Sequence, residues 1–479
     1  MDLNATLEVG ATSLHTPLYR RLTTAQLRAM HDATLEILQR IGIRFHSPRA
    51  LELFKSAGCE IVDGNRVHIG AGRVEWALNL VPKQIILYNQ MGEPAIRLSG
   101  RRAYFGPGSD LLNIIDHRTG EHRKPLLTDV VEAAQLFETL PNYDFVMSYL
   151  LPADVPTEKV EAYQMRAMLE NCTKPVIHVN TDLAHTVTDV AMAEALAGGE
   201  HALRQRPFLA NYINIASPLR HNQESVEKLI YLAEKGLPAI YRPSIVTRGL
   251  STPITVAGFL ALNNASQLAG LVLSQLAREG TPFIRCSHGG GTFDMRTMVG
   301  QHAAPEARGF NADMAHYYGL PAFGIGGLTG AKTVDQQAAM EAALTLLEAT
   351  LAGEQLIHDV SYMNNGLTGS FEQAIICHEM IDWVKAYLPG LEITPETLGL
   401  DVMQEIRDAG DFMVADHTLR HYKDDWYPQL LDRGDYQNWI DAGSLTLRDK
   451  AREKVDETLA AFTPKHVPDT VKRAWDALL

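Results

Sequence analysis

The feature of this 479-residue chain that most constrains its fold is a repeating alternation of short apolar runs with longer helical stretches. Each run is apolar or β-branched and is followed by a polar or glycine-containing turn. The runs are Ala103–Pro107, Asp144–Tyr149, Pro175–Asn180, Phe208–Ile215, Pro238–Ile245, Pro282–Ser287, Ala322–Gly327 and Gln355–Ser361. This alternation predicts parallel strands that are connected by helices.

A helical stretch lies between each pair of successive runs. These stretches are Asp129–Leu140, Thr157–Asn171, Ala184–Ala197, Gln223–Lys235, Val256–Arg278, Ala304–Tyr318 and Val334–Leu351. Eight strands with a helix after nearly every one predict an α/β protein with a (β/α)8 TIM barrel. An open, doubly wound sheet is the alternative, but no G-x-G-x-x-G sequence opens a helix after the first strand.

The chain is expected to have three parts. Residues 1–100 form an α+β lead-in, in which Thr23 and Gln26 have the spacing of a capping box and the first helix stops at Gly42. A second helix is expected over 47–57 and short strands over 66–69 and 84–88. Residues 101–400 form the catalytic barrel, and residues 401–479 form a helical C-terminal extension that packs on its flank.

Charge and cysteine content limit the function classes. With 43 Lys and Arg against 57 Asp and Glu, the net charge is −14, which disfavours nucleic acid and anionic membrane surfaces as partners. Four widely spaced cysteines, without a C-x-x-C pair, fit a reducing cytoplasm. No signal peptide is evident, and no window approaches the roughly 20 apolar residues of a membrane span. The sequence therefore predicts a soluble cytoplasmic protein.

Polar and glycine residues follow the predicted strands, and in a barrel these positions meet over one mouth. Glycines there let a large flat ligand approach the backbone, although tight turns are the simpler explanation for any one cluster. No phosphate-binding G-x-x-x-x-G-K-[ST] loop is present. The residues expected to contact a cofactor are Gly106, Gly108, Ser109, Asn214, Gly289, Gly290 and Gly291.

His358 and Asp359 end the eighth run and are the predicted catalytic pair. An imidazole beside a carboxylate can orient a substrate, transfer a proton or bind an anion while charged, but it can equally be a structural pair. His178, His288 and His358 with Cys286 could in principle form a zinc site. They lack paired local ligands, so we expect no tightly bound metal.

Aromatic rings past the strand ends are candidates for a cage around a quaternary ammonium group, because the negative face of a ring attracts a cation. Tyr149, Phe293 and Tyr362 are in such positions, although most mouth-proximal rings in a barrel belong to the core. Arg242, at the end of the fifth run, is a further candidate for substrate binding.

Several motifs resemble the trimethylamine methyltransferase family over essentially the full length. They are Leu22–Gln26, Tyr104–Gly108, Leu140–Phe145, Pro152–Pro156, Thr173–Pro175, Gln275–Gly280, Tyr317–Pro321, Asp335–Gln337, Gly366–Ser370, His417-Thr418 and Trp426–Pro428. The resemblance implies a barrel enzyme that moves a methyl group from an amine to the cobalt of a corrinoid (cobalamin-type cofactor) carried by a separate small protein.

Founding members of that family carry pyrrolysine, whereas this chain contains only standard residues. It therefore resembles the branch without pyrrolysine, which is associated with quaternary amines such as glycine betaine, proline betaine and carnitine. Glycine betaine, giving dimethylglycine, is the first choice because it is the smallest common quaternary amine with a carboxylate.

On this interpretation His358, when protonated, Arg242 or the glycine-loop N–H groups bind the substrate carboxylate, and Asp359 with the rings holds the ammonium group. A zinc-assisted methyltransferase or lyase, and a non-catalytic betaine- or corrinoid-binding protein, are the alternatives. A homodimer through the C-terminal segment is also expected.

Overall fold

A computed structural model describes residues 18–243, 247–287, 289–301, 303–407 and 410–479. Eight parallel strands form its central sheet, in the order β6-β18-β17-β14-β13-β11-β10-β9. They are β6 (Tyr104–Pro107), β9 (Val146–Met147), β10 (Val176–Val179), β11 (Leu209–Ile215), β13 (Ala239–Pro243), β14 (Phe283–Cys286), β17 (Ala322–Ile325) and β18 (Leu356–Val360). The two end strands meet where the Asp144 N–H donates to the Phe105 carbonyl at 2.6 Å, so the sheet curls into a nearly closed barrel.

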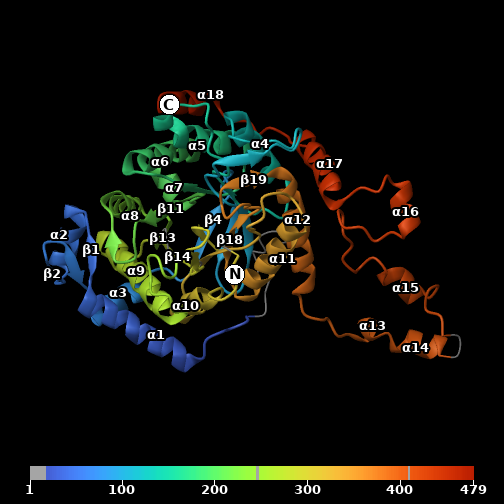
Figure 1. The fold of residues 1–479 in the computed structure, drawn as a ribbon, viewed down its shortest axis with the longest axis horizontal. Coiled ribbons are helices and arrows are strands. Elements are labelled where there is room, and N and C mark those ends of the chain that lie inside the picture. The colour runs from blue at the N-terminus through green and yellow to red at the C-terminus, as the bar shows by residue number, and fades with distance from the viewer. Residues whose placement is uncertain (1–17, 244–246, 288, 302, 408–409) are drawn as a thin grey trace.

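Helices follow the strands around the outside of this barrel (Figure 1). They are α4 (Leu127–Thr139), α5 (Val160–Asn171), α6 (Leu183–Ala197), α7 (Glu200–Gln205), α8 (Gln223–Lys235), α9 (Val256–Ala277), α10 (Phe310–Tyr318), α11 (Gln336–Leu351) and α12 (Phe371–Tyr387), with a 3-10 turn, η2 (Thr157–Lys159), before α5. The predicted (β/α)8 fold is confirmed.

A hairpin closes the amino-terminal end of the barrel. It consists of β4 (Ile85–Tyr88) and β5 (Pro94–Leu98), and the sequence analysis predicted only the first of these strands. Its inward side chains join one buried apolar cluster with the first residues of the barrel strands, such as Tyr104 and Leu356. This end is filled by packed side chains, so the carboxyl ends of the strands are left to form a site.

The N-terminal segment has the predicted α+β character. The Thr23–Gln26 capping box is present at the start of α1 (Thr24–Glu36), and a π-helical turn, η1 (Ile37–Ile41), ends at Gly42. The other elements are β1 (Ile43–Phe45), α2 (Pro48–Ser56), β2 (Glu60–Val62), β3 (Arg66–His68) and α3 (Ala71–Leu80), and β1 also pairs with β12 (Arg220–His221).

Some predicted boundaries were wrong. β9 covers only two of the six residues predicted for its run, and α10 begins at Phe310 because Gly309, at φ +79°, interrupts the backbone before it. The last residues of the run Pro238–Ile245 lie outside the described residues. Short strands that the sequence did not predict lie at the mouth and rim: β7 (Asn113–Ile115), β8 (His122–Arg123), β15 (Phe293–Asp294), β16 (Val299–Gly300) and β19 (Thr368–Ser370).

The C-terminal extension is helical, as predicted, but only part of it packs on the barrel. α17 (Leu447–Ala460) contacts α12 and α4, and α18 (Asp469–Asp476) buries Trp475 against α6. The described residues between 391 and 425, which are 391–407 and 410–425 and are here called the arm, project away from the barrel (Figure 1). The arm carries α13 (Pro395–Leu398), α14 (Leu400–Ile406) and α15 (Asp416–His421), and α16 (Tyr436–Asp441) follows it.

In the part of the chain that the structure describes, one helix, α9, is long and apolar enough to cross a membrane by length and composition alone. In the structure, 83% of its most apolar window is buried. Its neighbours are α1, α3 and α8, so its hydrophobicity is explained by its position as a core helix.

Candidate active site

A cavity of about 290 Å³ opens at the carboxyl ends of the barrel strands. Its size is near the lower limit for ligand pockets, which suits a small substrate. Most of the predicted site residues line it: Ser109, Asn214, Arg242, Gly289, Gly290, Gly291, His358, Asp359 and Tyr362. The structure thus brings together residues from β11, β13 and β18 and from the loops after β6 and β14.

Arg242 supplies a cationic group to the cavity. Its guanidinium donates to the Tyr212 hydroxyl from one nitrogen and to the Pro243 carbonyl, at 2.9 Å, from another. It also lies 5.7 Å from the centre of the Tyr212 ring. Nearby ionisable groups, Tyr212 first, outweigh burial and raise the pKa of Arg242. It therefore remains charged and is positioned to bind an anionic group.

Asp359 reaches the same cavity because β18 is irregular. Successive side chains of a strand normally point to opposite faces, yet His358 and Asp359 both line the cavity. The pairing of β18 with β6 shifts register between Ile357 and Val360, and Asp359 has φ +65°. Such a bulge redirects side chains and is common beside active sites.

Burial raises the pKa of Asp359 to about 7, although Arg242 and Arg308 lower it. Its carboxyl side chain is only 14% exposed. Near neutral pH the group is therefore divided between its neutral and charged forms. A cation that enters the cavity favours the charged form.

His358 is neutral in this environment. Its Nδ1 lies 2.6 Å from the Gly324 carbonyl, and its ring stacks on Phe323 with the ring centres 3.9 Å apart. Burial lowers the pKa of His358 to about 3. Since the imidazole stays uncharged at neutral pH, the expectation that a protonated His358 binds the substrate carboxylate is not supported. Its Nε2 lies 3.3 Å from Asp359 Oδ1, where a neutral ring can orient that carboxyl group.

Tyr362 forms part of the cavity wall and is held by the loop after β6. The Ser109 N–H donates to the Tyr362 hydroxyl at 2.6 Å, and the hydroxyl is also bonded to the Ser109 carbonyl. Gly108 leaves the space for the ring, because a Cβ there would lie 1.8 Å from Tyr362 Cε1. Gly108 therefore affects the cavity through the position of the Tyr362 ring and does not itself line the cavity.

Besides Gly108, three predicted residues are outside the cavity lining. Tyr149 is buried between the barrel and α4, where its ring contacts Phe137 and its hydroxyl accepts from Ser361 and from the Ser370 N–H. Gly106 is explained by packing, since a Cβ there would lie 2.2 Å from the Phe145 ring. Phe293 lies on β15 beside the mouth. Tyr149 is a core residue, and the prediction that it contacts substrate is not supported.

The sequence analysis missed a cluster of one basic and two acidic side chains that line the cavity, Arg308, Glu348 and Glu354. Arg308 Nε donates to Glu348 at 2.6 Å, and Glu354 lies beside them. Burial and the proximity of Glu348 raise the pKa of Glu354 to about 8, so this carboxyl is mainly neutral at pH 7. Gly324 makes room for it, since a Cβ there would lie 1.6 Å from Glu354 Oε2. Glu354 comes just before a strand and not after one, so strand-end reasoning could not find it.

The zinc alternative finds no support in the side chains at the mouth. His178 Nδ1 is 2.6 Å from Asp189 of α6, so this imidazole is used on the outer face of β10. His288 lies outside the described residues. Within the described ranges, the group of side chains arranged to hold a metal ion lies on the arm and consists of Glu396, His417 and His421.

Comparisons with known proteins point to one family. A family model described as trimethylamine methyltransferase (MTTB) matches residues 4–478. A curated relative from Desulfitobacterium hafniense, trimethylamine methyltransferase MttB, is 31% identical over 93% of this chain and 90% of its own length. A glycine betaine methyltransferase from the same species is 30% identical over 94% of each chain.

Among solved structures, the monomethylamine methyltransferase of Methanosarcina barkeri is similar over 91% of this chain and 93% of that one. The identity is 12% and the TM-score is 0.45.

Proposed function

Because the chain belongs to the trimethylamine methyltransferase family and is a methyltransferase, we propose that it takes its methyl group from a small quaternary amine. Glycine betaine is the foremost candidate, and proline betaine, carnitine and related betaines are the others. The proposed acceptor is the Co(I) of a corrinoid carried by a separate protein.

One observation carries this proposal: the same small cavity holds the charged Arg242 guanidinium and the Asp359 carboxyl group, whose charged form a bound cation favours. A betaine has a cationic nitrogen and a carboxylate in one molecule. The Arg242 guanidinium is suited to the carboxylate, and Asp359 with the Tyr362 ring is suited to the ammonium group. In this assignment Arg242 takes the anion-binding role, and neutral His358 orients Asp359.

The residues of the cavity also fit the chemistry of this donor. As a methyl group leaves a quaternary nitrogen, the nitrogen keeps the electron pair of the broken C–N bond and departs as a neutral tertiary amine. The two electrons of the new carbon–cobalt bond come from Co(I). No protein group need donate a proton. The protein's contribution is the orientation of donor and acceptor, which can be worth about 7–11 kcal/mol.

Trimethylamine is the second candidate, because one relative is named for it and because of Glu354. A tertiary amine that loses a methyl group would leave as an anion unless it is protonated. A carboxyl group with its pKa at about 8 is mainly protonated at pH 7 and could supply that proton. A quaternary amine therefore needs no proton donor in the cavity, whereas trimethylamine needs one.

The acceptor is proposed to dock at the mouth, beside Ser109, Asn214 and the loop 289–291. The loop glycines have packing reasons of their own, since a Cβ on Gly290 would lie 2.5 Å from the Phe259 ring and one on Gly291 2.1 Å from the Gln301 carbonyl. Their location at the rim, and not their residue type, supports this part of the proposal.

The decisive experiment mixes the purified protein with cob(I)alamin and a panel of amines and follows the loss of Co(I) absorbance. The panel contains glycine betaine, proline betaine, carnitine, trimethylamine and dimethylglycine. We expect rapid loss with one of the betaines and formation of the matching tertiary amine. Consumption of trimethylamine alone, or of no amine even with purified corrinoid proteins as acceptors, would overturn the proposal.

Two further parts of the proposal concern assembly and location. We propose that two copies associate through the C-terminal segment, because the arm exposes large apolar side chains such as Leu391, Ile393 and Val414. We also propose a cytoplasmic location. All four cysteines are free, as a reducing compartment would keep them.

A further inference from the structure

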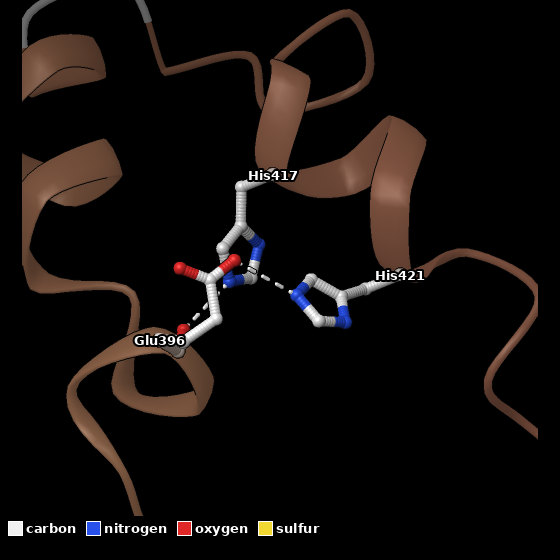
Figure 2. A group of neighbouring side chains, drawn as sticks. All are labelled: Glu396, His417 and His421. Atoms are coloured by element: carbon white, nitrogen blue, oxygen red, sulfur yellow. Dashed lines mark hydrogen bonds and ion pairs between the residues drawn. The ribbon is translucent and has the colours of Figure 1, made fainter.

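The arm carries a cluster of metal-ligating side chains that the proposed function does not use. Figure 2 shows Glu396, from α13, facing His417 and His421, which are four residues apart on α15. One potential ligand atom from each residue lies within 4.8 Å of the other two. We propose that these three residues bind a divalent transition-metal ion, with Zn²⁺ as the best match, and that the ion fastens α13 to α15.

The arrangement of the rings supports this inference. Residues at positions i and i+4 lie on the same face of a helix, so both imidazoles can reach one ion. His421 Nε2 is 3.1 Å from Glu396 Oε1, and His417 Nε2 is 3.0 Å from the Glu396 carbonyl (Figure 2). Both rings therefore lie against Glu396, His421 at its carboxylate and His417 at its backbone carbonyl, and His417 Nε2 must leave that carbonyl if this nitrogen is to bind the ion.

A second observation concerns the outer side of His421. Its Nδ1 lies 2.6 Å from the Asp424 carboxylate. Histidines that bind metals almost always donate their other ring N–H to a carboxylate, carbonyl or water, which fixes the tautomer and makes the inner nitrogen a better ligand. Asp424 provides this support and leaves Nε2 to bind the ion.

The distances require only local movement. Zinc binds imidazole and carboxylate ligands at about 2.0–2.2 Å, so tetrahedral ligand atoms lie about 3.4 Å apart. Contraction of a 4.8 Å cluster to that size needs shifts of about 1 Å in partly exposed side chains. Arg420, which now donates to Glu396 Oε1 at 2.7 Å, must release that oxygen when the ion binds. The fourth position belongs to water.

The two imidazoles also define the class of ion. Nitrogen ligands favour Zn²⁺ and its neighbours in the transition series, whereas Mg²⁺ and Ca²⁺ prefer oxygen. Since Glu396 and His417 are 21 positions apart in the chain, the ion would close a loop in a segment that projects from the barrel. Its role is to order the arm, because binding to the folded form alone stabilises that form.

The test uses the full chain without a polyhistidine tag, dialysed against Zn²⁺ and assayed for metal content. We expect one zinc ion per chain in the wild type and in His201→Ala, a control that removes an exposed histidine of α7. His417→Ala and His421→Ala should each lose the ion. Zinc content that is the same in the variant carrying both His417→Ala and His421→Ala as in the wild type, or absent from the wild type, would overturn the proposal.

Two further measurements separate a defined site from adventitious binding. Asp424→Asn should weaken zinc affinity about 10–100-fold in competition with a chromogenic chelator, because it removes the support of a ligand and not a ligand itself. Zinc should also slow proteolytic cleavage within residues 391–425 of the wild type but not of His421→Ala. Equal cleavage rates with and without zinc in the wild type would contradict the fastening role. None of these readouts depends on methyl transfer, so the two proposals fail separately.

Discussion

Arg242 is the residue whose substitution most directly tests the betaine assignment. Arg242→Gln removes the cation expected to bind the substrate carboxylate, and loss of one partner of such a buried pair costs about 2–5 kcal/mol. We expect kcat/KM for glycine betaine to fall at least ~30-fold. Turnover of tetramethylammonium, which has no carboxylate, should change much less.

The comparison between the two substrates controls for damage to the fold, because Arg242 also supports the Tyr212 hydroxyl. A structural defect lowers both rates together. Equal losses of kcat/KM for the betaine and for tetramethylammonium would therefore show that Arg242 does not bind the substrate carboxylate.

Asp359 predicts the pH dependence. Its pKa is raised to about 7, so the carboxylate is present above that pH and is protonated below it. Because the charged form attracts the ammonium group, kcat/KM for a quaternary amine should rise between about pH 6 and pH 8. Asp359→Asn should lower kcat/KM and remove this rise. Asparagine tolerates the φ of +65° at this position, so the bulge is retained. A rise of the same size in the variant would assign the titration to another group, such as Glu354.

At the scale of single elements, the loop after β6 and the wall at Tyr362 are predicted to act together. Gly108→Ala places a methyl group where the Tyr362 ring now lies, and overpacking of this kind costs about 1–3 kcal/mol. We expect a lower Tm and slow methyl transfer. Gly72→Ala is the matched control, because a Cβ there meets no atom within 4 Å.

Combining Gly108→Ala with Tyr362→Ala separates the two effects. The double variant should recover part of the lost Tm, since the clash is gone, but not the activity, since the wall is gone. Recovery of both would mean that Tyr362 has no role in the cavity.

The strands and helices of the barrel could be predicted because their signals are local. Runs such as Phe208–Ile215 and Val256–Arg278 carry their own periodicity and boundaries, and β11 and α9 closely match them. β9 could not be placed accurately, because its pairing is limited to two residues by the geometry of the barrel seam. The projection of the arm depends on which surfaces stay uncovered, and no local pattern encodes that.

The candidate site shows the same contrast between features that a local sequence pattern predicts and features that depend on residues distant in the chain. Strand-end reasoning placed Arg242, His358 and Asp359 at the mouth, and all three line the cavity, because parallel strands deliver such residues to one end of the barrel. It did not identify the state of His358, since a pKa depends on burial by residues distant in the chain. It also placed Tyr149 at the mouth. In the structure this residue follows the short strand β9, and its ring is buried in the apolar layer between the barrel and α4.

At the scale of the whole molecule, the arm predicts the oligomeric state. Met413 and Val414 are about three-quarters exposed, and an isolated chain rarely displays many such residues on one projecting segment. We expect light scattering to give about twice the 52.9 kDa of one chain. Met413→Glu with Val414→Glu should shift the protein to the single-chain mass. A wild type of 52.9 kDa at micromolar concentration would contradict this association.

The hairpin that closes the amino-terminal end of the barrel has a kinetic consequence. With that end filled, the proposed donor, acceptor and demethylated amine would all use the opening at the carboxyl ends of the strands. If the proposed acceptor protein docks over that opening, it blocks the opening, so the donor would have to enter before the acceptor binds, and the demethylated amine would leave only after the acceptor departs. The order of substrate binding and product release would thus follow from which end of the barrel the hairpin closes.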